Sequence, residues 1–144
     1  MSATNTFETA LLQHLFQNAN IANIGDATGL RGSSAAGSLF IGLFTADPTE
    51  TGSLAAEANY TGYARVAVAR SAGGFTVSGN QVTNAALVTF PKATGGSSNV
   101  THFAILTAIS AGTMLIKGSL DSALAVSTNI TPEFGVGDLI ATFE

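Results

Sequence analysis

Two apolar runs joined by a short segment constrain the fold more than any other part of the chain. Residues 99–109 and 114–120 are rich in β-branched and other apolar residues, and the segment between them, 110–113, contains a glycine. This pattern predicts a β-hairpin. Successive side chains point to opposite faces of a strand, and neither face of the first run is strongly polar. We therefore expect both faces of that strand to be covered, by a second sheet or by a neighbouring subunit.

Composition favours one domain with a surface that is easy to bury against another protein. The chain has 144 residues, enough for one domain with its own core. Only 10% of the residues are charged, against roughly 25% in typical domains, and 46% are hydrophobic. Small uncharged residues must cover much of the surface, so desolvation on association costs little. This favours a permanent oligomer or a lattice, and a monomer with a small-residue surface is the alternative.

Charge and cysteine content exclude several classes of partner. The formal net charge is −4 and the five basic residues are scattered, which gives no footprint for nucleic acid. The absence of cysteine excludes disulfides and thiolate metal sites. The apolar runs are shorter than a bilayer span, and the first residues lack the basic segment of a signal peptide. We expect no nucleic-acid or membrane partner.

Residues 6–17 are predicted to form an amphipathic helix. Asn5, three residues before Glu8, resembles a capping box. A helix of about three turns is marginal alone, so its apolar stripe is expected to dock on the β-domain or on a neighbour. The candidate interface residues on this stripe are Phe7, Leu11, Leu12 and Leu15, and Phe16 continues the same spacing.

Residues 18–37 are predicted to form a long loop because glycines and polar residues interrupt any regular pattern. A loop of this length in a compact domain is either functional or ordered by a partner. Arg31 is its only basic residue and is a candidate to bind carboxylates or carbonyls across an interface. The alternative is an ordinary surface loop with Arg31 in solvent.

The remainder of the chain is predicted to contain about eight strands at short spacing. In the run 64–70, alternation predicts Arg65 outward and Val66 and Val68 inward. The predicted fold class is mainly β, an antiparallel β-sandwich or jelly-roll-like domain with one N-terminal α-helix. A single domain would span 1–144, with the helix and arm at 1–37 and the β-domain at 38–144. Outside the hairpin, the predicted strands are 38–45, 64–70, 75–77, 85–90, 123–127, 130–134 and 138–143.

Motifs for catalysis or cofactor binding are not found. The two histidines, His14 and His102, lie outside any Gly-x-Ser-x-Gly pattern. Too few histidines and no cysteines are present for an imidazole–thiolate metal site, and the acidic residues do not follow a calcium-loop rhythm. Glycoside cleavage requires a pair of carboxylates, and the fold could bring two of the acidic residues together, so this activity is an alternative. We expect no catalytic residues, no metal, no cofactor and no enzymatic activity.

Several short stretches, taken in order, resemble a family of small tailed-bacteriophage virion proteins that are often labelled tail fibre or minor structural protein. They span most of the chain: residues 11–16, 39–48 (LFIGLFTADP), 63–65, 88–91, 100–103 and 137–139. The resemblance implies a structural protein of a phage particle, located in the virion, with no catalytic residues to transfer.

The leading hypothesis is a capsid decoration or cement protein that binds neighbouring subunits as a symmetric oligomer. Its expected partners are copies of itself and other virion proteins. The alternatives are a tail, neck or fibre component, and a receptor- or glycan-binding module. Exposed aromatic side chains would mark the last of these, and Tyr60 and Tyr63 are the only tyrosines.

Overall fold

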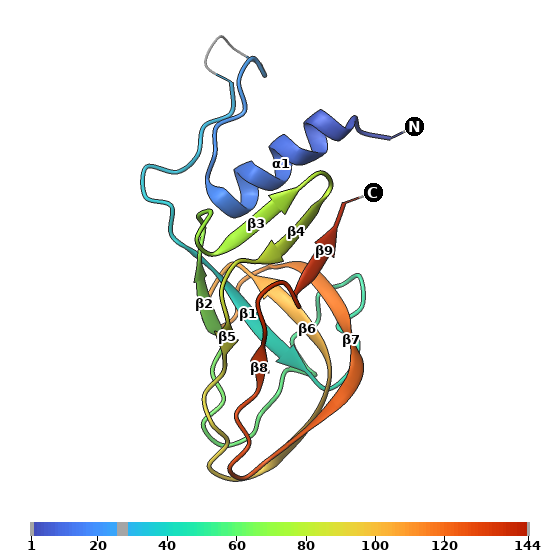
Figure 1. Cartoon of the computed structure of the whole chain (residues 1–144). Coiled ribbons are helices and arrows are strands. Elements are labelled where there is room, and N and C mark those ends of the chain that lie inside the picture. Colours follow the sequence, from blue (N-terminus) through green and yellow to red (C-terminus); the bar gives the residue numbers. More distant parts are fainter. Residues whose placement is uncertain (1, 26–28, 144) are drawn as a thin grey trace. The chain divides into compact units, whose positions relative to one another are not determined.

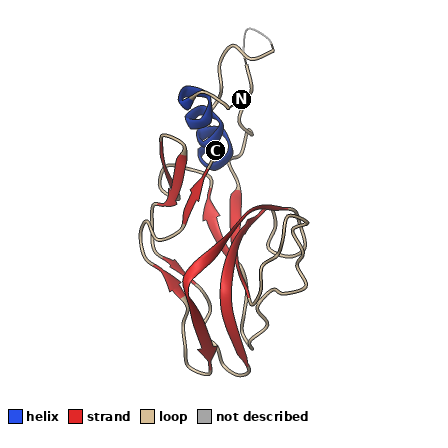
Figure 2. Ribbon diagram, turned by 90° about the vertical axis from the view of Figure 1, so that its right-hand side faces the viewer, coloured by secondary structure: helices blue, strands red, loops and turns tan. Residues whose placement is uncertain are grey.

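The computed structural model describes residues 2–25 and 29–143 and is mainly β, with one helix near the N-terminus (Figures 1 and 2). Its strands form antiparallel sheets, which confirms the predicted fold class. In chain order the described elements are α1 (Asn5–Gln17), β1 (Ser38–Phe44), β2 (Val66–Ala69), β3 (Phe75–Ser78), β4 (Gln81–Asn84), β5 (Val88–Thr89), β6 (Ser97–Leu106), β7 (Met114–Ser127), β8 (Glu133–Phe134) and β9 (Ile140–Thr142).

The chain divides into two compact units. The first, here called the helical unit, comprises Met1–Ser38, Val68–Leu87 and Phe134–Glu144. The second, the hairpin unit, comprises Leu39–Ala67 and Val88–Glu133. The predicted single domain, with the helix and arm at 1–37 and the β-domain at 38–144, stays a prediction.

Helix α1 begins one residue before its predicted start and is capped differently. Thr4 is the N-cap, and its side-chain oxygen accepts a hydrogen bond from the backbone N–H of Phe7 at 3.4 Å. Asn5, the predicted cap, is instead the first helical residue. At the other end Asn18 adopts a left-handed conformation, and its N–H donates to the carbonyl of Gln13, which ends the helix.

The helix packs on the β3–β4 hairpin within the helical unit. Its buried side chains are Leu12 and Phe16, and the rings of Phe16 and Phe75 meet edge to face at 5.0 Å. The sheet order is β3-β4-β9, so β4 is the central strand. The predicted docking of the helix on strands is confirmed, with Phe16 and Leu12 forming the contact core.

Residues of the predicted long loop fold back on one another. Ile21 and Leu30 exchange two backbone hydrogen bonds of 2.8 Å. The Asn18 side chain accepts from the N–H of Ser33 at 2.7 Å and donates to its carbonyl at 2.8 Å. A Cβ at Gly32 would collide with the Asn18 carbonyl, so this closure requires glycine. Residues 26–28 of the loop lie outside the described residues.

The central hairpin is confirmed in the hairpin unit. Strands β6 and β7 pair antiparallel from Leu106↔Met114 to Ser97↔Ser127, with irregularities between Val100 and His102 and between Ile105 and Leu106. Strand β7 continues through the predicted separate strand 123–127, and the sheet order is β2-β1-β6-β7. Both faces of β6 are buried from Phe103 to Leu106, as expected.

Two of the later strands are much shorter than predicted. The predicted strand 85–90 is reduced to β5, and 130–134 is reduced to β8. Pro91 follows β5 and Pro132 precedes β8, and proline cannot donate to a strand ladder. The Pro132 carbonyl nevertheless accepts from the N–H of Phe90 at 2.9 Å, which extends the pairing by one bond.

Candidate functional site

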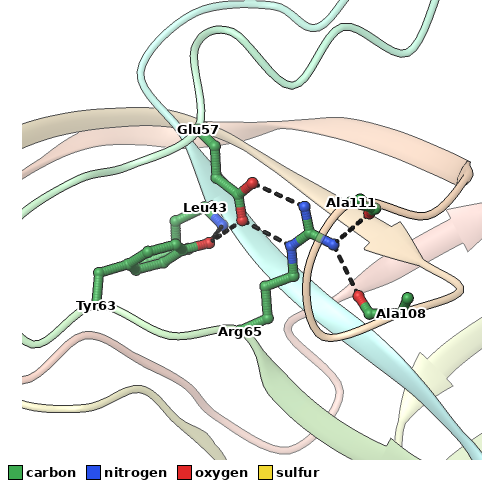
Figure 3. Close-up of polar contacts among 6 residues, drawn as sticks. All are labelled: Leu43, Glu57, Tyr63, Arg65, Ala108 and Ala111. Atoms are coloured by element: carbon green, nitrogen blue, oxygen red, sulfur yellow. Dashed lines mark hydrogen bonds and ion pairs between the residues drawn. The ribbon is translucent and has the colours of Figure 1, made fainter.

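Arg65 lies at the centre of a buried polar cluster in the hairpin unit, which corrects the prediction that it faces outward (Figure 3). Its side chain is only 2% exposed, because the residue precedes strand β2 and is outside that strand's alternation. The guanidinium is held in a bidentate ion pair, with Nε and Nη2 each 2.7 Å from a carboxylate oxygen of Glu57. This ion pair raises the pKa of Arg65.

The same guanidinium binds the loop that joins β6 to β7. Its Nη1 donates to the carbonyls of Ala108 and Ala111, both at 2.7 Å (Figure 3). The loop, residues 107–113, is closed by a bond of 3.0 Å from the N–H of Thr107 to the carbonyl of Thr113. Arg65 therefore connects the partly buried carboxylate of Glu57 to the tip of the central hairpin.

Tyr63 completes the cluster. Its hydroxyl donates to Glu57 Oε1 at 2.8 Å and accepts from the N–H of Leu43, on strand β1, at 3.1 Å (Figure 3). Burial raises the pKa of Tyr63 strongly, and the neighbouring Glu57 carboxylate adds to the effect. The polar groups of Glu57, Tyr63 and Arg65 thus bind one another and the backbone, as expected of a cluster that stabilises the fold.

An open hollow of about 380 Å³ lies beside this cluster. Ile109, at the tip of the 107–113 loop, lines it and is 61% exposed. The remaining lining residues are Leu54, Glu57, Ala58, Tyr63, Ala64, Arg65, Ser110 and Ala111. The cluster thus supports a loop that presents a large aliphatic side chain next to a mostly apolar hollow.

The interface residues predicted on the helix have different surroundings. Phe7 is 41% exposed and Leu12 is fully buried inside the helical unit. Leu11 and Leu15 are half-buried, and Arg31 is exposed on the arm. Leu12 is therefore part of the core of its own unit, while an interface role for the others stays a prediction.

The histidines and surface charges have local partners. His14 Nδ1 lies 2.7 Å from the carbonyl oxygen of Ala19, and His102 Nδ1 lies 2.9 Å from Thr101 Oγ1. Lys117 pairs on the surface with Asp47 at 3.1 Å and Glu50 at 3.2 Å. Within residues 2–25 and 29–143, no three metal-binding side chains gather in one place.

Neither tyrosine forms an exposed aromatic platform. Tyr60 is buried and donates its hydroxyl to the Pro91 carbonyl at 2.9 Å, and Tyr63 is half-buried. In the described part of the chain, no helix is long and apolar enough to cross a bilayer.

Sequence reasoning missed the Glu57–Arg65 pair, although a signal was present. These two are the only charged residues between positions 53 and 69. One acidic and one basic residue in a stretch without other charges are candidates for a buried ion pair, because a buried charge requires a partner.

Comparison with known proteins agrees with the resemblance found in the sequence. No curated protein matches the chain. A family model described as Podophage GP4 fiber I protein gp80 matches residues 2–142. The match extends over both compact units. The chain therefore belongs to the podophage GP4 fiber I protein gp80 family and is a fibre-type structural protein of the tailed-phage virion.

Proposed function

We propose that this protein is a subunit of a virion fibre, assembled from copies of itself and attached to other virion proteins. The observation that carries the proposal is the family match over residues 2–142 to a fibre protein. The match favours the fibre alternative over capsid decoration, which was the leading hypothesis from sequence.

Surface chemistry supports an assembly role. Only 10% of the residues are charged, so association desolvates few charges. Large apolar side chains are exposed in both units, including Leu87 and Val136 in the helical unit and Ile109 in the hairpin unit. Exposed apolar side chains are available for protein–protein contacts. The net charge of −4 supports protein partners over nucleic acid.

The polar cluster supports a structural role over an enzymatic one. Glu57, Tyr63 and Arg65 use their polar atoms on one another and on backbone groups. The burial of Tyr60 also removes one of the two tyrosines that a glycan-binding surface could use.

Copy number and position in the particle test the proposal. Quantitative mass spectrometry of purified virions, with the major capsid protein as internal standard, should give a small number of copies per particle. Gold-labelled antibody should then decorate the tail or discrete fibres. A copy number close to that of the major capsid protein, with label over the whole capsid, would establish decoration and overturn the fibre proposal.

A further inference from the structure

Strand β7 is a long edge strand of the sheet in the hairpin unit. It ends the strand order β2-β1-β6-β7, so in the described part of the chain no strand pairs with its second side (Figure 1). It has 14 residues, whereas β2, at the opposite edge, has 4. Proteins keep other strands from pairing with an edge by making the edge strand short or by placing proline or lysine in it. Strand β7 is long and contains no proline, so its edge is open to a further strand.

The hydrogen bonds of strand β1 show which backbone groups of the sheet face which neighbour. The carbonyl of Leu43 and the N–H of Thr45 bind residues 56–58, on the side away from β6. Backbone groups alternate in direction along a strand, so those of Phe44 face β6, where its register partner is His102. The backbone groups of His102 therefore face β1, and those of the next residue face β7.

The same alternation continues into β7. Phe103 lies opposite Gly118 in the register, so the backbone groups of these two residues face each other. Lys117 and Ser119, on either side of Gly118, therefore direct their N–H and C=O groups away from β6. Register irregularities on both sides limit the regular stretch to residues 116–119. The outward groups of Lys117 and Ser119 are those that an added short strand would bind.

The side chain of Lys117 does not guard this edge. A lysine on an edge strand hinders pairing when its charge projects into solvent. Here Nζ lies 3.1 Å from Asp47 Oδ1 and 3.2 Å from Glu50 Oε1, so the ammonium is held against the 47–50 turn. Two carboxylates and one ammonium give this cluster a net charge of −1. A basic side chain on the added strand is therefore favoured, whereas a second copy of the chain would bring a cluster of the same sign.

We propose that the β7 edge at Lys117 and Ser119 binds an extended segment of another virion protein, a segment that carries lysine or arginine and adds one strand to the sheet. Main-chain hydrogen bonds supply the affinity, and the negative cluster selects the basic segment. The proposal rests on the proposed function, in which the chain is attached to other virion proteins.

Hydrogen exchange at single-amide resolution, compared between the purified chain and intact virions, tests the open edge. The amides of Lys117 and Ser119 should exchange fast in the purified chain and at least about tenfold more slowly in virions. The amide of Gly118, which faces β6, is the internal control and should be protected in both. Unchanged exchange of the two outward amides in virions would overturn the proposal. Equal protection in the purified chain would also overturn it, because the edge would then be closed without another virion protein.

A proline substitution provides a second measurement. Ser119→Pro removes an outward N–H and leaves the backbone groups of Gly118 free to pair with β6, so the thermal midpoint should be kept. Its copy number per virion should fall at least about tenfold. Ser119→Ala is the matched control, since it keeps the N–H and should be incorporated as the wild type is. Wild-type incorporation of folded Ser119→Pro would overturn the proposal. Few copies per particle with an unprotected edge reject only this interface, whereas a copy number matching the major capsid protein with a protected edge rejects only the fibre role.

Discussion

Two arginines five residues apart, Arg65 and Arg70, each join distant segments of the chain, but their guanidinium groups bind different partners. In the hairpin unit, Arg65 is buried and binds a carboxylate together with two loop carbonyls. In the helical unit, Arg70 is half-buried and binds carbonyls at the end of α1, from Nε to Leu15 at 2.7 Å and from Nη2 to His14 at 2.9 Å.

Their surroundings explain the difference. A guanidinium that keeps contact with water is stabilised sufficiently by carbonyls at a helix C-terminus, where the helix dipole is negative. A guanidinium removed from water requires a full counter-charge, and Glu57 supplies it. Both residues connect distant segments, but only the Arg65 cluster depends on a second ionisable residue.

The largest effect is expected when Arg65 loses its counter-charge. Glu57→Ala leaves a buried guanidinium unpaired and should lower the free energy of unfolding by about 3–5 kcal/mol, measured by urea denaturation. Glu50→Ala is the control, because the Glu50 side chain is 95% exposed, and it should unfold as the wild type does. A loss below about 1 kcal/mol for Glu57→Ala would mean that the pair is no more important than a surface salt bridge.

Removing Arg70 should cost less. Arg70→Ala frees the His14 and Leu15 carbonyls to bind water and should lower the free energy of unfolding by about 1–2 kcal/mol. Arg70→Lys keeps the charge at the helix end and should recover part of this loss. If Arg70→Ala were as damaging as Glu57→Ala, burial would not explain the difference between the two arginines.

Tyr63 gives the Arg65 cluster a pH dependence. The protonated phenol donates to Glu57, and its pKa is raised above the ordinary value of about 10. Its contribution is therefore complete below pH about 10 and is lost as the pH rises through the raised pKa. In the folded chain, the tyrosinate absorbance of Tyr63 at 295 nm should appear only well above pH 10, and Tyr63→Phe should remove that ionisation step. Ionisation of both tyrosines near pH 10 with native circular dichroism would contradict this.

The smallest effect is expected at the surface pair of Lys117 and Asp47. A hydrogen bond from the Thr49 N–H and the nearby Lys117 lower the pKa of Asp47. Its contribution is thus present above the ordinary carboxyl pKa and lost as the pH falls through the lowered value. Both groups face solvent, so Lys117→Ala should leave the thermal midpoint unchanged at physiological salt. A clear drop would show that exposed pairs matter here as much as the buried one.

The elements that could be predicted from sequence are those with a strong local pattern. The β6–β7 hairpin, β1 and α1 follow from apolar runs and helical spacing, which act over a few residues. The sequence pattern predicts longer strands than β5 and β8, because the extent of pairing near Pro91 and Pro132 depends on partners distant in sequence. The N-cap was misplaced by one residue because Thr4 and Asn5 are both good caps.

The candidate site was less predictable. The alternation rule failed at Arg65 because its orientation is set by Glu57 and by the carbonyl of Ala108, 43 positions away. The apolar run predicts that Ile109 belongs to the first arm of the hairpin, whereas the strand ends at Leu106 and Ile109 is exposed. Only the tertiary structure shows that Ile109 and the hollow share one face.

Hydrogen exchange of the 107–113 loop tests most directly whether Arg65 organises the hairpin tip. In Arg65→Lys, a single ammonium cannot bind Glu57 in bidentate form and also hold the carbonyls of Ala108 and Ala111. We predict that the amide hydrogens of Thr107 and Thr113 exchange much faster in this variant than in the wild type. Residues 75–84 of the helical unit should exchange at unchanged rates. Equal exchange of the loop in both proteins would contradict the role assigned to Arg65.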